Sequence, residues 1–274
     1  MAKKKWTSEH ISWSTAPWQL DIFAHLHQVY GFNFKHFPSP TEITASIKTG
    51  SSRFEQLGYE FIEQNDETLT GASGYEDFIY RVKQIPTRNS SWHDFFNACI
   101  WGLFPNSKQA LNHQHIEQIQ RHGSSQRSRK RDILTQFDEC GIVLAYQNEQ
   151  DKIDLRNHQW IDVFWHRRNH WQQQIKPFIF GHAIYEMSLE AFIGLTAKAL
   201  FIKVDDRFFN KTLKDQYSEL DNQVTDLMQK ADIFADKTNL SPLPVLGIPG
   251  WSCDNLSLSY YKNTDYFRPR RDKR

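Results

Sequence analysis

The sequence predicts an α+β fold that is predominantly helical and forms a single domain over residues 1–274. Several stretches place apolar residues three and four positions apart, as amphipathic helices do, whereas β-rich runs are short and few. A chain of 274 residues can bury one large core, and no clear linker divides it. Apolar residues make up only 39% of the chain, but nine Trp, ten Tyr and twenty Phe each bury a large area.

The first 74 residues predict a helical part that ends in a loop. Residues 18–30 (WQLDIFAHLHQVY) carry one apolar face, and residues 39–50 begin with a helix-start pattern, SPTE. The composition of residues 63–74 (EQNDETLTGASG) is typical of a loop, after which residues 75–82 resume a helix.

Residues 90–146 are central because most polar groups capable of chemistry fall there. The apolar stripe of the first helix consists of Trp92, Phe95, Phe96, Cys99, Ile100 and Leu103. The other side carries His93 and Asn97, one turn apart. His93 would lie in the first turn, where the helix dipole keeps its ring neutral and able to accept a proton or bind a metal. The alternative is a histidine that neighbouring backbone groups satisfy.

Pro105 ends that helix, and a second helix follows. Lys108, Asn112 and His115 fall at i, i+4 and i+7, on one face of it. A lysine in the first turn opposes the helix dipole unless an anion lies nearby, so Lys108 indicates a phosphate or carboxylate, or else a solvated side chain. Helices joined by so short a turn should pack together, so we expect their polar faces to line one cleft.

A basic run and a predicted hairpin complete this stretch. The basic residues are Arg121, Arg127, Arg129, Lys130 and Arg131. Such a run is typical of a solvated loop or of a patch that contacts phosphates. Residues 133–137 and 142–146 are β-rich and flank DECG, so they predict an antiparallel hairpin in which Gly141 supplies a positive φ. Asp138 and Glu139 would be metal or arginine partners if they pointed inward, although turn residues more often face water.

The segment PFIFGHAIYEMSLEAF places His182 and Glu186 one helical turn apart. The two could ligate a metal, but the second histidine of a HExxH site is missing. A buried His–Glu pair that fixes the helix is the favoured interpretation.

The remaining segments predict further helices, a strand and a strap. Residues 160–175 and 209–232 read as helices, and residues 196–204 as a buried strand. The segment SPLPVLGIPGWSCD is too rich in Pro and Gly for regular structure and too apolar for solvent, so it predicts an irregular strap across the body. A basic tail follows, with Arg268, Arg270, Arg271, Lys273 and Arg274.

The chain resembles a bacterial family known as domain of unknown function 3025. The motifs that carry the resemblance are WHDFFNACIWGLFPNSKQALNHQH, RDILTQFDECG, GHAIYE, and PLPVLGIPGW followed by YFRPR. They cover roughly residues 75–270 and leave residues 1–74 less family-like. The resemblance implies no activity, cofactor or catalytic residue, so only the motif positions carry over.

Charge and composition limit the class of protein. Lys and Arg total 33 against 32 Asp and Glu, a net charge of +1, so no global field favours nucleic acid or membrane. The start MAKKK lacks a following apolar signal segment, and charged residues within 177–203 argue against a membrane span. Three widely spaced cysteines fit a reducing compartment. We therefore expect a cytoplasmic protein with no membrane partner.

The leading hypothesis is a hydrolase that acts on an anionic, phosphorylated or nucleic-acid substrate from a site between the two central helices. A histidine would be the general base, the lysine would hold negative charge, and the asparagines would position the substrate. The candidate catalytic residues are His93, Asn97, Lys108, Asn112 and His115. The candidate substrate-binding residues are Arg88 and Arg131. The candidate ligands of a divalent metal are His182, Glu186 and Asp138.

The rival hypothesis is a non-enzymatic module that binds RNA or a protein through the basic loop 121–131 and the C-terminal tail. A third interpretation is that the polar clusters only stabilise a scaffold. The sequence leaves the substrate, the oligomeric state and enzymatic activity itself open.

Overall fold

The computed structural model describes residues 8–123 and 126–270 and has the α+β fold expected from the sequence. The α-helices of this part of the chain are α1 (Ala24–Tyr30), α2 (Pro40–Gly50), α3 (Ser52–Leu57), α4 (Tyr75–Val82), α5 (Trp92–Leu103), α6 (Pro105–His122), α7 (Arg129–Cys140), α8 (Glu149–Arg156), α9 (His182–Ser188), α10 (Leu213–Lys230) and α11 (Leu258–Tyr261). The strands are β1 (Glu60–Glu63), β2 (Gln84–Thr87), β3 (Gly141–Tyr146), β4 (Ile175–Ile179), β5 (Thr196–Lys203) and β6 (Ser241–Pro244). Short 3-10 and π turns connect them.

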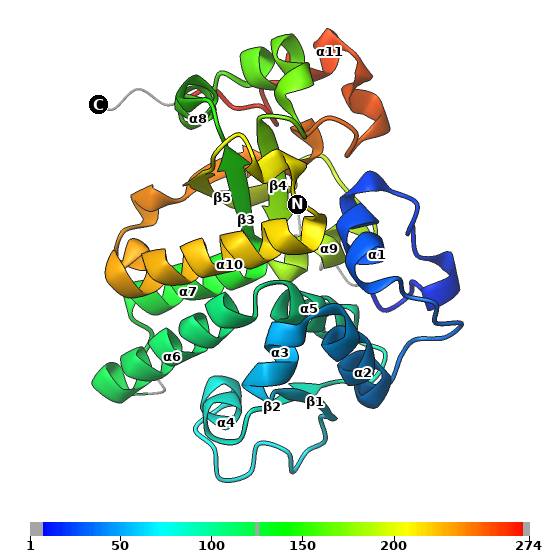
Figure 1. Cartoon of the computed structure of the whole chain (residues 1–274), viewed down its shortest axis with the longest axis vertical. Coiled ribbons are helices and arrows are strands. Elements are labelled where there is room, and N and C mark those ends of the chain that lie inside the picture. The colour runs from blue at the N-terminus through cyan, green and yellow to red at the C-terminus, as the bar shows by residue number, and fades with distance from the viewer. Residues whose placement is uncertain (1–7, 124–125, 271–274) are drawn as a thin grey trace.

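Helices surround a central four-stranded sheet, and the two-stranded parallel sheet of β1 and β2 lies at the far end of the molecule from α8 and α11 (Figure 1). The order of the central sheet is β4-β3-β5-β6. Strand β3 runs antiparallel to β4 and parallel to β5, so the sheet is mixed rather than antiparallel. All of β3 (GIVLAY) is buried, as is typical of a strand covered on both faces.

The hairpin predicted near residues 133–146 is wrong. Residues 133–137 belong to α7, which continues to Cys140. The Ser128 side chain caps this helix by accepting a hydrogen bond from the amide of Arg131. The helix packs against α9 and β3, and this tertiary packing overrides the β propensity of the run ILTQF.

The DECG segment consequently lies at a helix end and not in a hairpin turn. Asp138 and Glu139 occupy the last turn of α7, and Gly141 begins β3 with a φ of −72°, not the positive φ expected. The antiparallel partner of β3 is β4, which follows only after α8 and the turns behind it.

Helix α5 is the central helix of the molecule. Every residue from Phe95 to Leu103 is buried, while the start of the helix, at His93 and Asp94, stays partly open. The Trp92 ring stacks on the Trp13 ring, with centroids 5.4 Å apart and an interplanar angle of 6°. Helix α5 packs against α2 and α9, and α6 packs beside α4, α7 and α10 (Figure 1).

In the Pro- and Gly-rich strap, the short edge strand β6 pairs antiparallel with β5, and a 3-10 turn over Val245–Gly247 follows it. Beyond it, the side-chain amide of Asn255 donates to the carbonyls of Leu246 and Ile248, at 3.0 and 2.8 Å. Arg168 donates to the carbonyl of Asn255 at 2.8 Å. Beyond β6, side-chain hydrogen bonds therefore hold the chain in place of the backbone hydrogen bonds of a sheet. No helix of residues 8–123 or 126–270 combines the length and apolar character that a membrane crossing requires.

Candidate functional site

A pocket of about 300 Å³ opens among α4, α5, α6, α7 and α9. The residues that line it are Gln64, Tyr75, Glu76, Arg88, His93, Asp94, Asn97, His115, Thr135, Asp138, Glu139 and His182. Three histidines and four carboxylates thus share one space, which gathers the side chains that bind metals and move protons.

His93, the second residue of α5, joins the pocket to α9. Its Nδ1 lies 2.9 Å from Oε2 of Glu186, and the Ser8 hydroxyl donates to Oε1 of the same carboxylate at 2.8 Å. In a neutral ring the nitrogen that faces a carboxylate carries the proton, so Nε2 is left with its lone pair. Glu186 therefore sets both the orientation and the tautomer of His93.

His182 and Glu139 meet His93 on the pocket side. Nε2 of His182 lies 2.9 Å from Nε2 of His93 and 3.4 Å from Oε2 of Glu139. Oε1 of Glu139 lies 3.9 Å from Nε2 of His93. One ligand atom from each residue falls within 4.8 Å of the others, which suits a metal ion. We refer to these three residues as the His–His–Glu centre.

Gly181 permits the close approach of α9 to α7 that builds this centre. A Cβ at position 181 would lie 2.5 Å from the main-chain oxygen of Glu139 and 2.3 Å from the amide nitrogen of Gly141. The amides of Phe180 and Gly181 both donate to the carbonyl of Gly141, at 3.1 and 2.7 Å. These contacts bring the next residue, His182, against the last turn of α7.

Lys108 is buried, with 3% of its surface exposed, and its partners lie within the protein. Its Nζ donates to Oδ1 of Asn97 at 3.0 Å and forms an ion pair with Asp138. Asn97 in turn donates to the Tyr75 hydroxyl at 3.1 Å. Burial alone would raise the pKa of Asp138, but Lys108 holds it below its usual range. The anion that Lys108 meets in this structure is therefore an internal carboxylate.

Burial and charge shift the pKa values of the pocket residues in different directions. Burial lowers the pKa of His182 to about 3 and also lowers the pKa of His115. Burial opposes protonation of His93 as well, but the carboxylates of Glu186 and Glu139 raise its pKa above the ordinary value. Burial raises the pKa of Glu139. The pocket therefore pairs a proton-attracting His93 with a neutral His182.

Most of the candidate residues from the sequence line this pocket, and the others lie outside its lining. Those that line it are Arg88, His93, Asn97, His115, Asp138 and His182. Asn112 lies behind its wall, where it donates to Oε2 of Glu76 at 2.5 Å. Arg131, in α7, is not among the lining residues.

The metal-capable group differs from the set that the sequence indicated. Of that set, His182 belongs to the His–His–Glu centre. Glu186 binds the far nitrogen of His93, and Asp138 is paired with Lys108. His182 and Glu186, one helical turn apart, thus have different roles. His182 is a member of the centre, whereas Glu186 orients the His93 ring from behind.

Arg88 is the exposed cation at the edge of the pocket, with 57% of its side chain exposed. Its guanidinium binds both carboxylate oxygens of Asp94, at 2.9 and 2.8 Å, and its amide donates to the same group. This bidentate pair holds the guanidinium at the pocket edge.

Tyr75 is a pocket residue that the sequence does not indicate, and Glu139 is one that the sequence indicates only as an alternative to a water-facing turn residue. Glu139 falls in the turn of the predicted hairpin, where acidic side chains face water. The helical spacing of Ile133 and Phe137 after the capping Ser128 is the signal that could have placed Glu139 on a helix. No feature of the sequence around Tyr75 distinguishes it from an ordinary helix-start residue.

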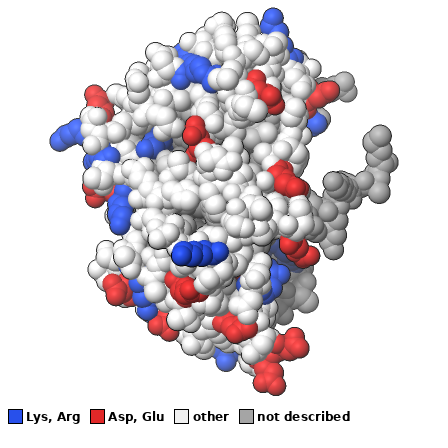
Figure 2. Space-filling view, turned by 90° about the vertical axis from the view of Figure 1, so that its right-hand side faces the viewer, with Lys and Arg blue, Asp and Glu red and all other residues white. Residues whose placement is uncertain are grey.

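The basic run between residues 121 and 131 carries internal ion pairs. Arg127 pairs with Asp132, and Lys130 pairs with Asp232. Figure 2 shows Lys and Arg side chains interspersed with Asp and Glu over one face of the molecule. These pairings reduce the positive charge available to a phosphate backbone. Residues 124–125 of the loop and 271–274 of the tail lie outside the described residues.

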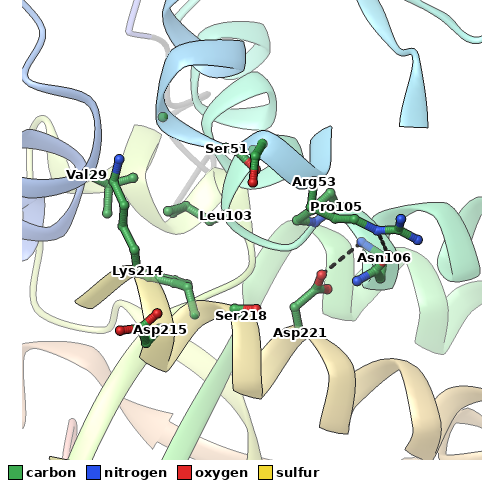
Figure 3. Close-up of a pocket in the computed structure, with 14 residues that line it drawn as sticks. Val29, Ser51, Arg53, Leu103, Pro105, Asn106, Lys214, Asp215, Ser218 and Asp221 are labelled. Atoms are coloured by element: carbon green, nitrogen blue, oxygen red, sulfur yellow. Dashed lines mark hydrogen bonds between the residues drawn. The ribbon is translucent and has the colours of Figure 1, made fainter. Parts of the chain in front are cut away.

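A second pocket, of about 230 Å³, lies where α3, the start of α6 and α10 meet (Figure 3). Asp221 accepts hydrogen bonds there from the amides of Asn106 and Ser107, at 3.0 and 2.8 Å, and Arg53 donates to the Asn106 side chain at 2.7 Å. Asp221 therefore caps α6 and joins it to α10, which gives this carboxylate a structural role.

Comparison with known proteins identifies the family of the chain. A family model described as protein of unknown function (DUF3025) matches residues 59–271. The match begins at residue 59, whereas the resemblance in the motifs begins near residue 75. The matched region includes the whole His–His–Glu centre. No curated protein and no solved structure matches the chain. Because the matched region spans most of its length, the chain belongs to the DUF3025 family.

Proposed function

We propose that this protein is a hydrolase and that the water it uses is activated at the His–His–Glu centre. The observation that carries the proposal is the meeting of Nε2 of His93, Nε2 of His182 and the Glu139 carboxylate beside an open pocket. Glu186 fixes the first of these rings. Preorganised imidazole and carboxylate groups next to an open pocket are the usual means of preparing water for attack.

A second proton acceptor is available in the same pocket. His115 lines the pocket wall, and burial lowers its pKa, so the ring is neutral near pH 7. Its Nδ1 is buried and has no hydrogen-bond partner within the described residues, so Nε2 would be the atom that takes up a proton from water. We therefore assign the general-base role to His115 and leave His93 within the His–His–Glu centre.

The substrate that we propose is a small anionic ester. A pocket of about 300 Å³ fits only a small group, and Arg88 lies at its edge. The hydroxyl of Tyr75 and the amide of Asn97 are polar groups in the wall that could orient it. Carboxylates nevertheless outnumber cations in the lining, so binding of an anion requires added positive charge at the centre.

We also expect the protein to work in a reducing compartment such as the cytoplasm. Its three cysteines, Cys99, Cys140 and Cys253, are all unpaired.

The test is an activity survey with site variants. Purified protein, with Zn²⁺ or Mn²⁺ present, is assayed against p-nitrophenyl phosphate, bis-p-nitrophenyl phosphate and p-nitrophenyl acetate. We expect Glu139→Gln and His115→Gln to lower kcat by at least about 100-fold on the substrate that is turned over. His113→Gln is the matched control, because His113 is an exposed histidine of α6 outside the pocket lining. Full activity in both pocket variants, or no turnover of any of the three esters, would count against the proposal.

A further inference from the structure

We propose that the His–His–Glu centre binds one divalent transition-metal ion of the zinc class, through Nε2 of His93, Nε2 of His182 and the carboxylate of Glu139. The catalytic role of this ion rests on the proposed hydrolase function, because it would be the agent that activates the water. Binding itself does not depend on that function and can be measured without a substrate.

The spacing of the ligand atoms suits such an ion. Zinc bonds of about 2.0–2.1 Å place the ligands of a tetrahedral ion about 3.3 Å apart. The separations here are 2.9 Å between the two Nε2 atoms, and 3.4 and 3.9 Å from these atoms to the Glu139 oxygens. Two imidazoles and one carboxylate form a ligand set that occurs in catalytic zinc sites.

The type of ligand narrows the choice of ion. Two nitrogen donors disfavour Ca²⁺ and Mg²⁺, which take oxygen ligands. Imidazole with carboxylate suits Zn²⁺ and neighbouring transition metals. Three protein ligands leave at least one coordination position for water, and the pocket of about 300 Å³ provides space for it.

The surroundings of His93 resemble the outer shell of a metal site. A histidine ligand usually donates its other N–H to a carboxylate, and Nδ1 of His93 lies 2.9 Å from Glu186. Ser8 holds the second oxygen of that carboxylate at 2.8 Å. His182 is fixed by burial, with 3% of its surface exposed. Its Nδ1 makes no hydrogen bond of standard geometry within the described residues, although the main chain of Asp138 lies close by.

The local charges also favour a cation between the two rings. With Nδ1 of His93 facing Glu186, the lone pair of its Nε2 points at the other imidazole, 2.9 Å away. A proton on either Nε2 relieves that repulsion but leaves Glu139 at 3.4 and 3.9 Å without a close partner. A divalent cation would remove the repulsion between the two nitrogens and also give Glu139 a partner, because both nitrogens and the carboxylate can coordinate it.

Nearby cations do not already serve this purpose. Lys108 is bound by Asp138 and Asn97, and Arg88 is bound by Asp94. The negative charges of Glu139 and Glu186 are thus balanced only by the two histidines, or by a bound ion.

Metal titration of the full-length, untagged protein tests the proposal. The protein is stripped with a chelator, exchanged into chelator-free buffer, and titrated with Zn²⁺ in a calorimeter and with Co²⁺ by visible absorption. We expect one ion per chain with a micromolar or tighter Kd, and Co²⁺ bands of four- or five-coordinate character. His182→Gln and Glu139→Gln should each weaken binding by at least about 100-fold, and Glu186→Gln by about 10–100-fold.

Matched controls come from the exposed face of α6. His113→Gln and Glu117→Gln remove the same residue types outside the pocket, so their affinities should equal that of the wild type. His182 is buried, so its variant could fail to fold. Glu139, with 37% of its side chain exposed, then carries the test.

The outcomes separate this inference from the proposed function. The inference fails if folded wild-type protein binds no ion in the micromolar range, or if Glu139→Gln binds as tightly as the wild type. Stoichiometric binding without any ester hydrolysis would keep the metal site and remove the hydrolase. Hydrolysis that persists unchanged in ion-free protein would keep the hydrolase and remove the catalytic role of the ion, while the titration still decides whether the ion binds.

Discussion

Replacement of Gly181 by alanine tests whether the contact between α9 and α7 builds the site. Gly181 has a φ of −78°, so alanine meets no backbone strain. The added methyl would lie 2.3 Å from the amide nitrogen of Gly141 and 2.5 Å from Cys140 N and Glu139 O. Non-bonded atoms prefer about 3.5 Å or more, so α9 must move by about 1 Å. Overpacking usually costs about 1–3 kcal/mol, and we expect about 3 because the crowded atoms are main-chain atoms.

The loss should be visible as a lower melting temperature. A change of 1 kcal/mol shifts the Tm of a chain of this size by about 2–4 °C, so Gly181→Ala should melt roughly 6–12 °C below the wild type. Differential scanning calorimetry and urea unfolding measure this directly. A shift of α9 by about 1 Å would also separate His182 from Glu139, now 3.4 Å apart, and weaken Zn²⁺ binding.

Gly31→Ala is the control for a glycine replacement without crowding. No atom lies within 4 Å of a Cβ at this position, and its φ of +58° adds only the left-handed backbone penalty. That penalty is about 1–2 kcal/mol, and Zn²⁺ binding should not change. If Gly181→Ala unfolds at the wild-type temperature, the contact does not hold α9 in place and the reasoning is refuted.

Two further predictions concern buried charge. Lys108→Met removes the buried cation that pairs with Asp138, whose side chain is only 17% exposed, so the free energy of unfolding in urea should fall by about 3 kcal/mol. Adding Asp138→Asn should recover part of that loss, and a double variant no more stable than the single one would contradict the pairing. Burial, with a smaller effect of Lys176, lowers the pKa of His25 from 6.5 to about 3. Because the unfolded chain then binds the proton first, stability should be full above about pH 6.5 and fall toward pH 3, by up to about 1.4 kcal/mol per pH unit. His25→Asn, which can keep the 2.9 Å hydrogen bond to Tyr217, should flatten the plot of Tm against pH, and an unchanged slope would be inconsistent with this assignment.

Local patterns in the sequence predicted the two central helices and the residues on their polar sides. The spacing of apolar residues in 92–103 and the break at Pro105 fix both elements, and the structure has α5 and α6 there. His93 and Asn97 line the pocket as neighbours on α5. Helical periodicity and proline chemistry act within a few residues, so a single sequence displays them.

The composition of the centre could not be read in the same way. His93 and His182 are 89 positions apart, and their contact depends on how α9 packs against α5. The run ILTQFDECG has β-rich composition but packs as a helix end, which moved Glu139 from an exposed turn to the pocket. Tertiary packing decides such cases, and no local spacing encodes it.

The misplaced charge on Lys108 shows a related limit. A lysine near the start of a helix indicates an anion, and an anion is present. It is the Asp138 carboxylate of the same chain, 30 positions away, and not a ligand. The helix dipole predicts that the partner of the lysine is negatively charged. It does not indicate whether that partner is a ligand or another side chain of the protein.

The aromatic stacking on α5 bears on how this protein can be shortened. Residues 8–58 precede the region shared with the family, yet the Trp13 ring covers Trp92 and Ser8 holds the carboxylate behind His93. A fragment that begins at residue 59 would expose the Trp92 ring to solvent. It would also lose the Ser8 hydroxyl that holds Glu186 behind His93. Fragments prepared for crystallisation or assay should therefore retain residue 8 onward, because the limit of sequence similarity falls inside a cooperative folding unit.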